Sequence, residues 1–296
     1  MEHIEYIPAK NIVTRTKNSG WFGCEYNMNI YRGCPHGCIY CDSRSACYGT
    51  VDFDTVKVKE DALRLINHDL SRKIKPGVVS TGAMSDPYNP LEKELCLTRH
   101  ALELISAHGF GVSIATKSVL VTRDTDVLRE IREHSPVLIK FTITCADDAL
   151  SQKVEPYAPT SGERFKALEI MAQGGFFAGI LLMPVLPFIQ DNADNILSIV
   201  ERAAQCGARF IYPAFGMTMR DNQRDYFLEN AEKLFPGIAA KYVSRYGGNY
   251  NCPSPKAKEL WQLFKNSCDK HGILYNMKDI ISGYKTGYSD SQLSWF

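Results

Sequence analysis

The sequence predicts an α/β fold in which a parallel sheet is built from strands joined by helical crossovers. Short apolar runs alternate with longer segments of helical spacing over about 190 residues. The helical segments are long enough to cross back over a sheet. A cysteine-rich loop directly follows the first run, at the kind of strand end where chemistry gathers in such folds. The pattern by itself fits both a barrel and an open, doubly wound sheet.

Glycine and proline mark the ends of most predicted helices. Pro76-Gly77 ends the first, while Gly109, Gly174 and Gly207 follow three later ones as C-cap signals. A polar loop rich in Asp and Pro is expected after the fourth strand. The strands are expected at 27–31, 78–81, 111–116, 137–144, 176–185 and 209–213, and the helices at 61–73, 95–108, 124–133, 161–173 and 192–206.

Three segments are expected along the chain. Residues 1–25 form an irregular lead-in interrupted by Pro8, Gly20 and Gly23, and residues 26–215 carry the alternating core. Residues 216–296 form a mixed, mainly helical C-terminal extension. Within it we expect a loop at 216–221, helices at 225–234 and 255–271, and a short strand at 273–275.

The composition is that of an ordinary globular protein. The chain has 296 residues, with 34 Lys plus Arg against 33 Asp plus Glu. Such a balance produces no global basic field, so a nucleic-acid site would have to be a local patch. Ten cysteines are scattered without a secretory signal or a long apolar run. A reducing cytoplasm, with no membrane association, is the expected compartment.

The chemistry-bearing motif is the loop Cys34-Pro35-His36-Gly37-Cys38-Ile39-Tyr40-Cys41. Thiolates are soft ligands suited to iron and zinc. Three of them in one loop can hold three irons of a [4Fe–4S] cube, leaving the fourth open for a ligand that is not protein. A structural zinc site with His36 as fourth ligand is the alternative, although His36 would have to fold back on its own loop.

This CxxxCxxC motif, with an aromatic residue before its last cysteine, resembles the radical S-adenosylmethionine (SAM) superfamily. The resemblance implies a [4Fe–4S] cluster at Cys34, Cys38 and Cys41, with SAM chelating the fourth iron. It also implies a partial (β/α)6 TIM-type barrel, and reductive cleavage of SAM to methionine and a 5′-deoxyadenosyl radical.

Residues at the predicted strand ends are candidates for holding SAM. Ser85, with Asp86 beside it, can accept hydrogen bonds from the SAM ammonium, and Lys117 can pair with the SAM carboxylate. Tyr40 is expected to face adenine, and Thr142 is a candidate for the ribose. Pro184, after the fifth strand, resembles the strand end that lines adenine in this superfamily. The alternatives are ordinary packing for Tyr40, a simple turn for Ser85 and Asp86, and a solvated side chain for Lys117, while Thr142 faces the interior only in one register.

Several segments narrow the resemblance to the spore photoproduct lyase-like, DNA repair photolyase-like branch. They cover roughly residues 25–215: the cysteine loop, Ser85-Asp86-Pro87-Tyr88, Thr116-Lys117-Ser118, Glu155-Pro156 followed by Arg164, and the strand into Pro184. In that family the residues that match Ser85, Lys117 and Thr142 line the SAM pocket. The family is linked by name to the repair of thymine-dimer lesions in DNA.

One departure argues against a true spore photoproduct lyase. In the true lyase a cysteine two positions before the matching serine donates a hydrogen atom to the product radical, and Ala83 stands there instead. Cys145, just past the fourth strand, is the candidate that could reach the same cavity, with a buried structural cysteine as the other interpretation. Three further cysteines are alternatives for the donor: Cys24, Cys47 and Cys252.

The leading hypothesis is therefore a radical SAM enzyme that abstracts a hydrogen atom from a substrate bound over the cluster. The substrate is either a nucleic-acid lesion or a peptide or small metabolite, and a reductant such as flavodoxin or ferredoxin is an expected partner. Four residues could contact phosphate or stack on bases: Arg220, Arg245, Tyr246 and Tyr250. A non-catalytic module whose cysteines hold a structural metal is the alternative class.

Overall fold

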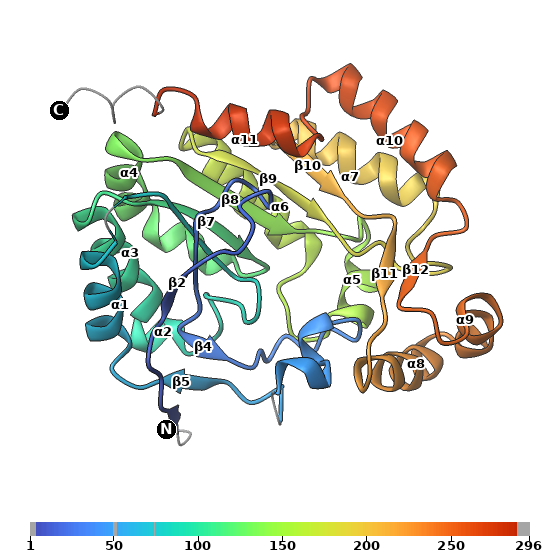
Figure 1. Ribbon diagram of the computed structural model, residues 1–296. Helices are drawn as coiled ribbons and strands as arrows, with labels where there is room; N and C mark the ends of the chain where they lie inside the picture. The colour runs from blue at the N-terminus through green and yellow to red at the C-terminus, as the bar shows by residue number, and fades with distance from the viewer. Residues whose placement is uncertain (1–3, 50–51, 74, 289–296) are drawn as a thin grey trace.

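The computed structural model describes residues 4–49, 52–73 and 75–288. Its main sheet has seven strands in the order β10-β9-β8-β7-β6-β3-β2 (Figure 1). Six of them, from β3 to β10, are parallel, and β2 pairs antiparallel with β3 at one edge. The bounds are β2 Val13–Arg15, β3 Tyr26–Met28, β6 Val78–Thr81, β7 Gly111–Thr116, β8 Val137–Thr142, β9 Phe177–Leu182 and β10 Phe210–Pro213.

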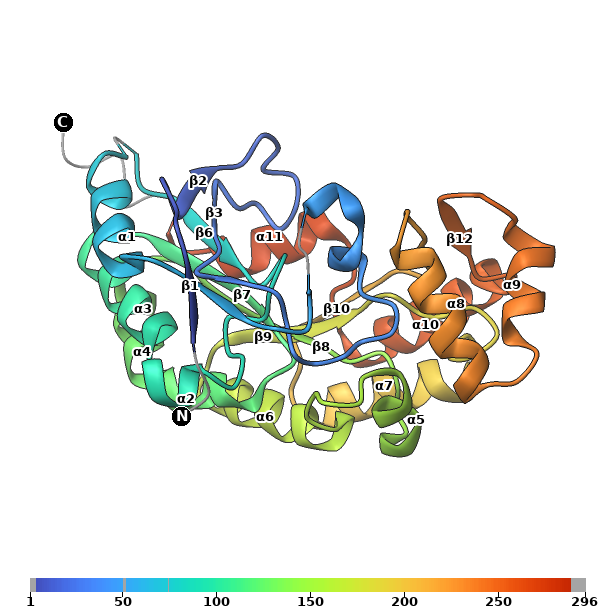
Figure 2. The ribbon, with the colours of Figure 1, turned by 90° about the horizontal axis from the view of Figure 1, so that it is seen from below.

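The helices that connect these strands cover one face of the sheet (Figure 2). Strand residues alternate between the two faces. Ile114 of β7 and Ile139 and Phe141 of β8 therefore pack under the helices in the largest apolar cluster. The five predicted crossover helices are confirmed as α1 Ala62–Ser71, α3 Leu97–Ala107, α4 Thr125–His134, α6 Ser161–Gln173 and α7 Ala193–Gln205.

The other face is the interior of an incomplete barrel. In the described sheet β3 and β10 lie at opposite ends of the parallel row and do not pair. Aromatic residues before β3 close the gap instead, because Trp21 and Phe22 contact Tyr212 with ring centroids 5.4 and 5.5 Å apart. Helix α11 (Met277–Lys285) seals the interior, and its Tyr284 hydroxyl donates to the Phe22 carbonyl at 2.6 Å. The partial barrel is thus confirmed.

Several secondary-structure expectations need correction. The 1–25 lead-in is not irregular throughout, because it contributes β2 and also β1 (Glu5–Ile7), which joins β4 (Tyr31–Arg32) and β5 (Lys57–Lys59) in a small sheet. The predicted strand 27–31 is divided between β3 and β4. The expected strand at 273–275 is a single bridge from Leu274 to Phe210. The boundaries at 25/26 and 215/216 stay predictions.

Several short helices and a small two-stranded sheet were not predicted. The expected loop at 216–221 contains β11 (Gly216–Thr218), which pairs antiparallel with β12 (Asn251–Pro253). Four helices of the structure were not predicted: α2 Glu92–Leu95, α5 Asp148–Val154, α9 Ile238–Tyr246 and α11. The two predicted C-terminal helices are confirmed as α8 Gln223–Leu234 and α10 Ala257–His271. Among the described residues, none of the helices is both long and apolar enough to cross a membrane.

Candidate active site

The cysteine loop follows β4 and is fixed by backbone hydrogen bonds to distant segments. The Cys34 amide donates to the Phe53 carbonyl at 2.8 Å, and the Ile39 amide donates to the Val154 carbonyl at 3.0 Å. Gly33 enters the loop with φ +82°, and a Cβ there would lie 2.2 Å from the Thr55 carbonyl oxygen. These contacts hold the loop over the carboxyl ends of the strands, where a parallel barrel places its chemistry.

A cavity of about 710 Å³ opens beneath this loop. Its size falls within the ~300–1,000 Å³ range of ligand pockets. The cavity wall is formed by the cysteine loop, the ends of β6 to β9 and the two-stranded β11–β12 sheet. All the predicted cluster and SAM residues line it: Cys34, Cys38, Cys41, Tyr40, Ser85, Lys117, Thr142 and Pro184. The structure therefore brings this set together, while the role of each member stays a prediction.

The three thiols suit a positively charged metal group. Burial raises the pKa of Cys34 to about 11, and Asp86 adds to the effect. Burial also raises the pKa of Cys38 and of Cys41, and Lys117 offsets only part of this rise. Thiolates are the donors that hold iron–sulfur clusters, and all three cysteines line one cavity, so the donor set is of the kind that fits this group. His36 makes a different contact, since its Nδ1 lies 3.6 Å from Asp86 Oδ2.

The loop after β6 fits tightly against both neighbouring segments. Gly82 has φ +92°, and a Cβ there would lie 1.8 Å from the Ala115 carbonyl oxygen, so only glycine allows this approach. Ser85 donates its hydroxyl to the Gly33 carbonyl, which leaves its own oxygen able to accept. Asp86 accepts from the Lys117 amide at 2.8 Å and the Thr116 hydroxyl at 2.7 Å. Asp86 therefore joins two strand ends, and its carboxylate is already engaged by the protein.

Lys117 belongs to a buried charge network that supports the cysteine loop. Glu155 lies between two cations, with Lys117 Nζ at 4.0 Å and an Arg164 guanidinium nitrogen at 2.5 Å. The Tyr40 hydroxyl also donates to Glu155. Burial opposes ionisation of Glu155, but Arg164 and Lys117 outweigh it and lower its pKa. Burial would lower the pKa of Lys117, but Cys38 and Glu155 raise it above its usual value. The network keeps a charged ammonium at the cavity wall.

Cys145 does not line the cavity, although it packs in one buried cluster with Cys38, Ile39 and Tyr40 of the cysteine loop. Its role as a hydrogen-atom donor stays a prediction. The Cys145 thiol accepts from Gln190 Nε2 at 2.8 Å, and burial raises its pKa to about 12. Among the alternative donors, Cys252 lines the cavity, but its thiol donates to the Asn249 carbonyl at 3.6 Å.

The four predicted substrate residues divide into two pairs. Arg220 does not itself line the cavity, but its Nε lies 3.1 Å from Oδ1 of Asp42, which does, and a guanidinium nitrogen lies 2.8 Å from the Tyr250 hydroxyl. Tyr246 is only 5 % exposed and donates its hydroxyl to the Pro253 carbonyl, so it cannot stack on a base. Arg245 lies on α9 and does not line the cavity. The structure thus brings Arg220 and Tyr250 together and leaves the other pair elsewhere.

Sequence reasoning gave no role to two charged residues at the site. Glu155 is 1 % exposed and organises the network described above. Lys140 lies in the middle of β8, is 1 % exposed and lines the cavity. Lys140 had a detectable signal, because a lysine interrupts an otherwise apolar strand, Val-Leu-Ile-Lys-Phe-Thr. Apart from the family resemblance, no sequence signal marked Glu155, because its partners Tyr40 and Lys117 are far from it in the sequence.

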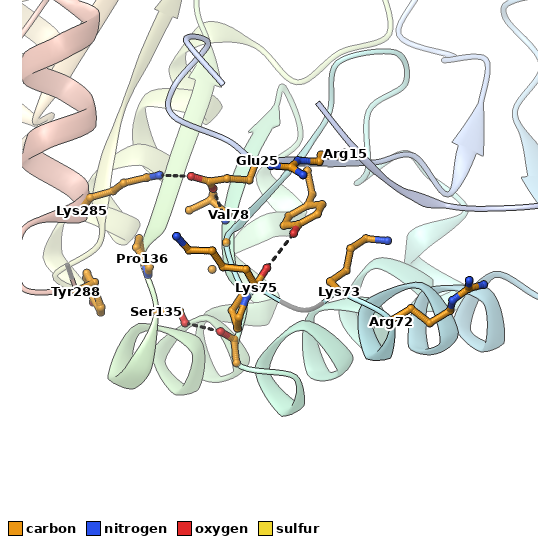
Figure 3. A pocket seen from close by; sticks show the side chains of 15 residues that line it. Arg15, Glu25, Arg72, Lys73, Lys75, Val78, Ser135, Pro136, Lys285 and Tyr288 are labelled. Carbon is orange, nitrogen blue, oxygen red and sulfur yellow. Dashed lines mark hydrogen bonds and ion pairs between the residues drawn. The ribbon is translucent and has the colours of Figure 1, made fainter. Parts of the chain in front are cut away.

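A second pocket, of about 580 Å³, lies at the amino ends of the strands (Figure 3). It is basic, and Glu25 in its wall pairs with Lys285 at 3.0 Å. Arg72, Lys73 and Lys75 follow the carboxyl end of α1, where cations offset the helix dipole. Strands β6 and β7 contribute to both pockets, which lie at opposite ends of these strands.

The fold and site together define a class of protein: a partial parallel barrel with a three-cysteine loop over the carboxyl ends of its strands. A family model described as the Radical SAM superfamily matches residues 28–202. The chain therefore belongs to the radical SAM superfamily and is a radical SAM enzyme. Membership implies a [4Fe–4S] cluster and SAM, as the cysteine motif predicted.

Relatives and solved structures agree with this assignment. A Mycobacterium tuberculosis protein is 28% identical over 257 residues, which cover 84% of this chain and 75% of the relative. A Methanocaldococcus jannaschii protein is 33% identical over 189 residues, which cover 62% and 68% of the two chains. Both relatives are described as uncharacterized.

Among solved structures, spore photoproduct lyase complexed with dinucleoside spore photoproduct aligns with a TM-score of 0.67 at 15% identity, covering 90% of this chain and 80% of the other. The radical SAM methyltransferase TsrM from Kitasatospora setae, with cobalamin and a [4Fe–4S] cluster bound, aligns with a TM-score of 0.58 at 11% identity, covering 89% and 58%. At these identities the likeness shows the fold alone, and that fold is like the one predicted.

Proposed function

We propose that this protein cleaves SAM reductively and abstracts a hydrogen atom from a substrate held in the cavity beneath the cysteine loop. The observation that carries the proposal is that the three motif cysteines and all five predicted SAM residues line this one cavity. When bound, the cluster supplies the electron that converts SAM to methionine and a 5′-deoxyadenosyl radical. The protein supplies orientation and the exclusion of water.

The chain's own residues have distinct parts in this proposal. Cys34, Cys38 and Cys41 hold the cluster. Lys117, kept charged by Glu155, pairs with the SAM carboxylate, and the Ser85 oxygen accepts from the SAM ammonium. Thr142 and Pro184, on neighbouring strand ends, border the nucleoside half of SAM, beside Tyr40. A flavodoxin or ferredoxin is the proposed physiological electron donor.

The direct test is product analysis. Anaerobically reconstituted protein, reduced chemically and mixed with SAM, is expected to release 5′-deoxyadenosine, measured by liquid chromatography and mass spectrometry. Unreduced protein is the control and should release none. A reduced, iron-loaded protein that leaves SAM intact would contradict the proposal and favour a structural metal site.

Replacing Lys117 with methionine is expected to keep the cluster but weaken SAM binding about 10- to 150-fold. The physical reason is the loss of one charge-assisted hydrogen bond, worth ~1.5–3 kcal/mol. The measurement is SAM affinity by calorimetry, with iron content as the check on the cluster. Lys75→Met, in the basic pocket at the other end of the sheet (Figure 3), is the matched control and should leave affinity unchanged. Equal affinity in Lys117→Met and wild type would refute the assignment.

For the substrate we propose a nucleic-acid lesion. Two observations support it: the fold similarity to spore photoproduct lyase, and the Arg220 guanidinium, which lies 4.9 Å from the Tyr250 ring and contacts Asp42 of the cavity wall. Arginine and tyrosine of this kind contact phosphate and stack on bases. Binding to single-stranded and damaged duplex DNA should therefore weaken steeply as salt rises. Absence of binding at low salt would favour a peptide or small metabolite instead.

A further inference from the structure

Lys140 places a buried positive charge inside the barrel, on the wall of the candidate active site. Along β8, residues 137, 139 and 141 pack under the helices, whereas Leu138 belongs to the interior cluster. Lys140 and Thr142 follow Leu138 on that interior side, and both line the cavity. The residues level with Lys140 on the two neighbouring strands are small: Ala115 of β7 and Gly179 of β9.

The contacts of Lys140 include no counter-charge. Its Nζ donates to the Ser113 hydroxyl at 2.6 Å and lies 4.6 Å from the centre of the Phe22 ring. Within the described part of the chain, no carboxylate lies at ion-pair distance from it. Lys117 differs in this respect, because Glu155 already stands beside it. An ammonium has three donors, so Lys140 retains hydrogen-bonding capacity toward the cavity.

Such an arrangement costs stability. Burial of a charge without a partner is unfavourable, and here it lowers the pKa of Lys140 to about 8. Nearby Cys24 acts in the opposite direction. Leu138, two residues earlier on the same side, shows that an apolar side chain fits this interior. The lysine therefore makes physical sense if a negative group enters the cavity and completes the pair.

We propose that Lys140 binds an oxyanion of the substrate, a phosphate or a carboxylate, in the interior of the barrel beneath the SAM site. This inference rests on the proposed function, because it names the substrate class of the same cavity. Lys140 stands opposite Ala115 in the β7–β8 register, and Lys117 lies two residues further toward the open end. That is about 7 Å of strand. The two lysines thus serve two anions at different depths.

The test measures anion binding to cluster-loaded protein saturated with SAM and kept oxidised, so that no turnover is needed. Inorganic phosphate and acetate are titrated by calorimetry, with radiolabelled phosphate in equilibrium dialysis as a second readout. Wild type is expected to bind one equivalent of one of these anions, and Lys140→Met to bind it at least ten times more weakly. Tighter phosphate binding identifies a phosphate-bearing substrate, and tighter acetate binding a carboxylate.

Two controls exclude other sources of binding. Lys75→Met removes a cation from the basic pocket of Figure 3 and should leave anion affinity unchanged. SAM affinity should be the same in Lys140→Met and wild type, because Lys117 holds the SAM carboxylate. If Lys140→Met does not fold, Lys140→Gln is measured in its place.

Three results would overturn the proposal. They are anion binding that survives Lys140→Met, no anion binding to the SAM-saturated wild type, and loss of SAM affinity in Lys140→Met as large as in Lys117→Met. The last result would assign Lys140 to SAM. None of these three results depends on SAM cleavage. Failure of the proposed function would instead be seen as the absence of 5′-deoxyadenosine, so the two failures can be told apart.

Discussion

Replacing Cys38 with alanine is expected to remove the cluster and reduce 5′-deoxyadenosine formation to the background of protein-free buffer. Cys38 is the middle member of the three-cysteine set and is buried against the cavity. Two thiols cannot hold three irons of the cube, and no other thiol of the set can take its place. Iron content after anaerobic reconstitution should fall from about four atoms per chain to nearly none.

The matched control for this variant is Cys47→Ala. Cys47 is an exposed cysteine in the same region of the chain, six residues after Cys41, and it does not line the cavity. It should retain the iron, the visible absorption and the product yield of wild type. If Cys38→Ala kept iron and a SAM-responsive spectrum, the cysteine loop would not be the cluster site.

The second large effect concerns folding. Arg164→Leu is expected to lower the free energy of unfolding by ~3–5 kcal/mol, because it leaves Glu155 buried with only Lys117 as a counter-charge. Arg164 is fully buried, and its guanidinium also donates to the Thr142 carbonyl at 2.9 Å. Urea unfolding of cluster-free protein at neutral pH measures the change. A decrease in the free energy of unfolding of less than about 1 kcal/mol would show that the Lys117–Glu155–Arg164 network does not stabilise the fold.

The exposed salt bridge between Arg64 and Asp61 is the control for the Arg164 variant. Its side chains are 71% and 64% exposed, and Arg64→Leu should cost less than ~1 kcal/mol. The pH dependence gives a second check. The folded-state pKa of Glu155 is lowered, so its contribution is complete above the unfolded value of ~4.3 and is lost as pH falls further. The stability gap between Arg164→Leu and wild type should therefore narrow below about pH 4.

The local hydrophobic pattern of the sequence was sufficient to predict the strands and helices of the core. The strand 78–81 and the strand 111–116 were predicted with the bounds that β6 and β7 have, since both are apolar runs ended by glycine or a charged residue. Helix α5 was missed because seven residues give too few turns to show a period. Helix α9 had a signal, because Ile238, Tyr242 and Tyr246 recur every fourth residue and are buried.

The place of Cys145 depends on tertiary packing. It follows the end of β8 by three residues, yet it packs with Cys38 and Tyr40 of the cysteine loop and does not line the cavity. Tyr246 was expected to contact phosphate or stack on bases, and helix α9 instead buries it against β12.

The amino-acid sequence by itself determined the alternating architecture, the three-cysteine loop and the strand-end residues around it. These features are local, and parallel strands bring their carboxyl ends to one edge wherever the rest of the chain lies. Tertiary structure decided which charges meet. Lys117, Glu155 and Arg164 form one network, and Lys140 stands without a carboxylate among the described residues, because packing between distant segments sets these distances.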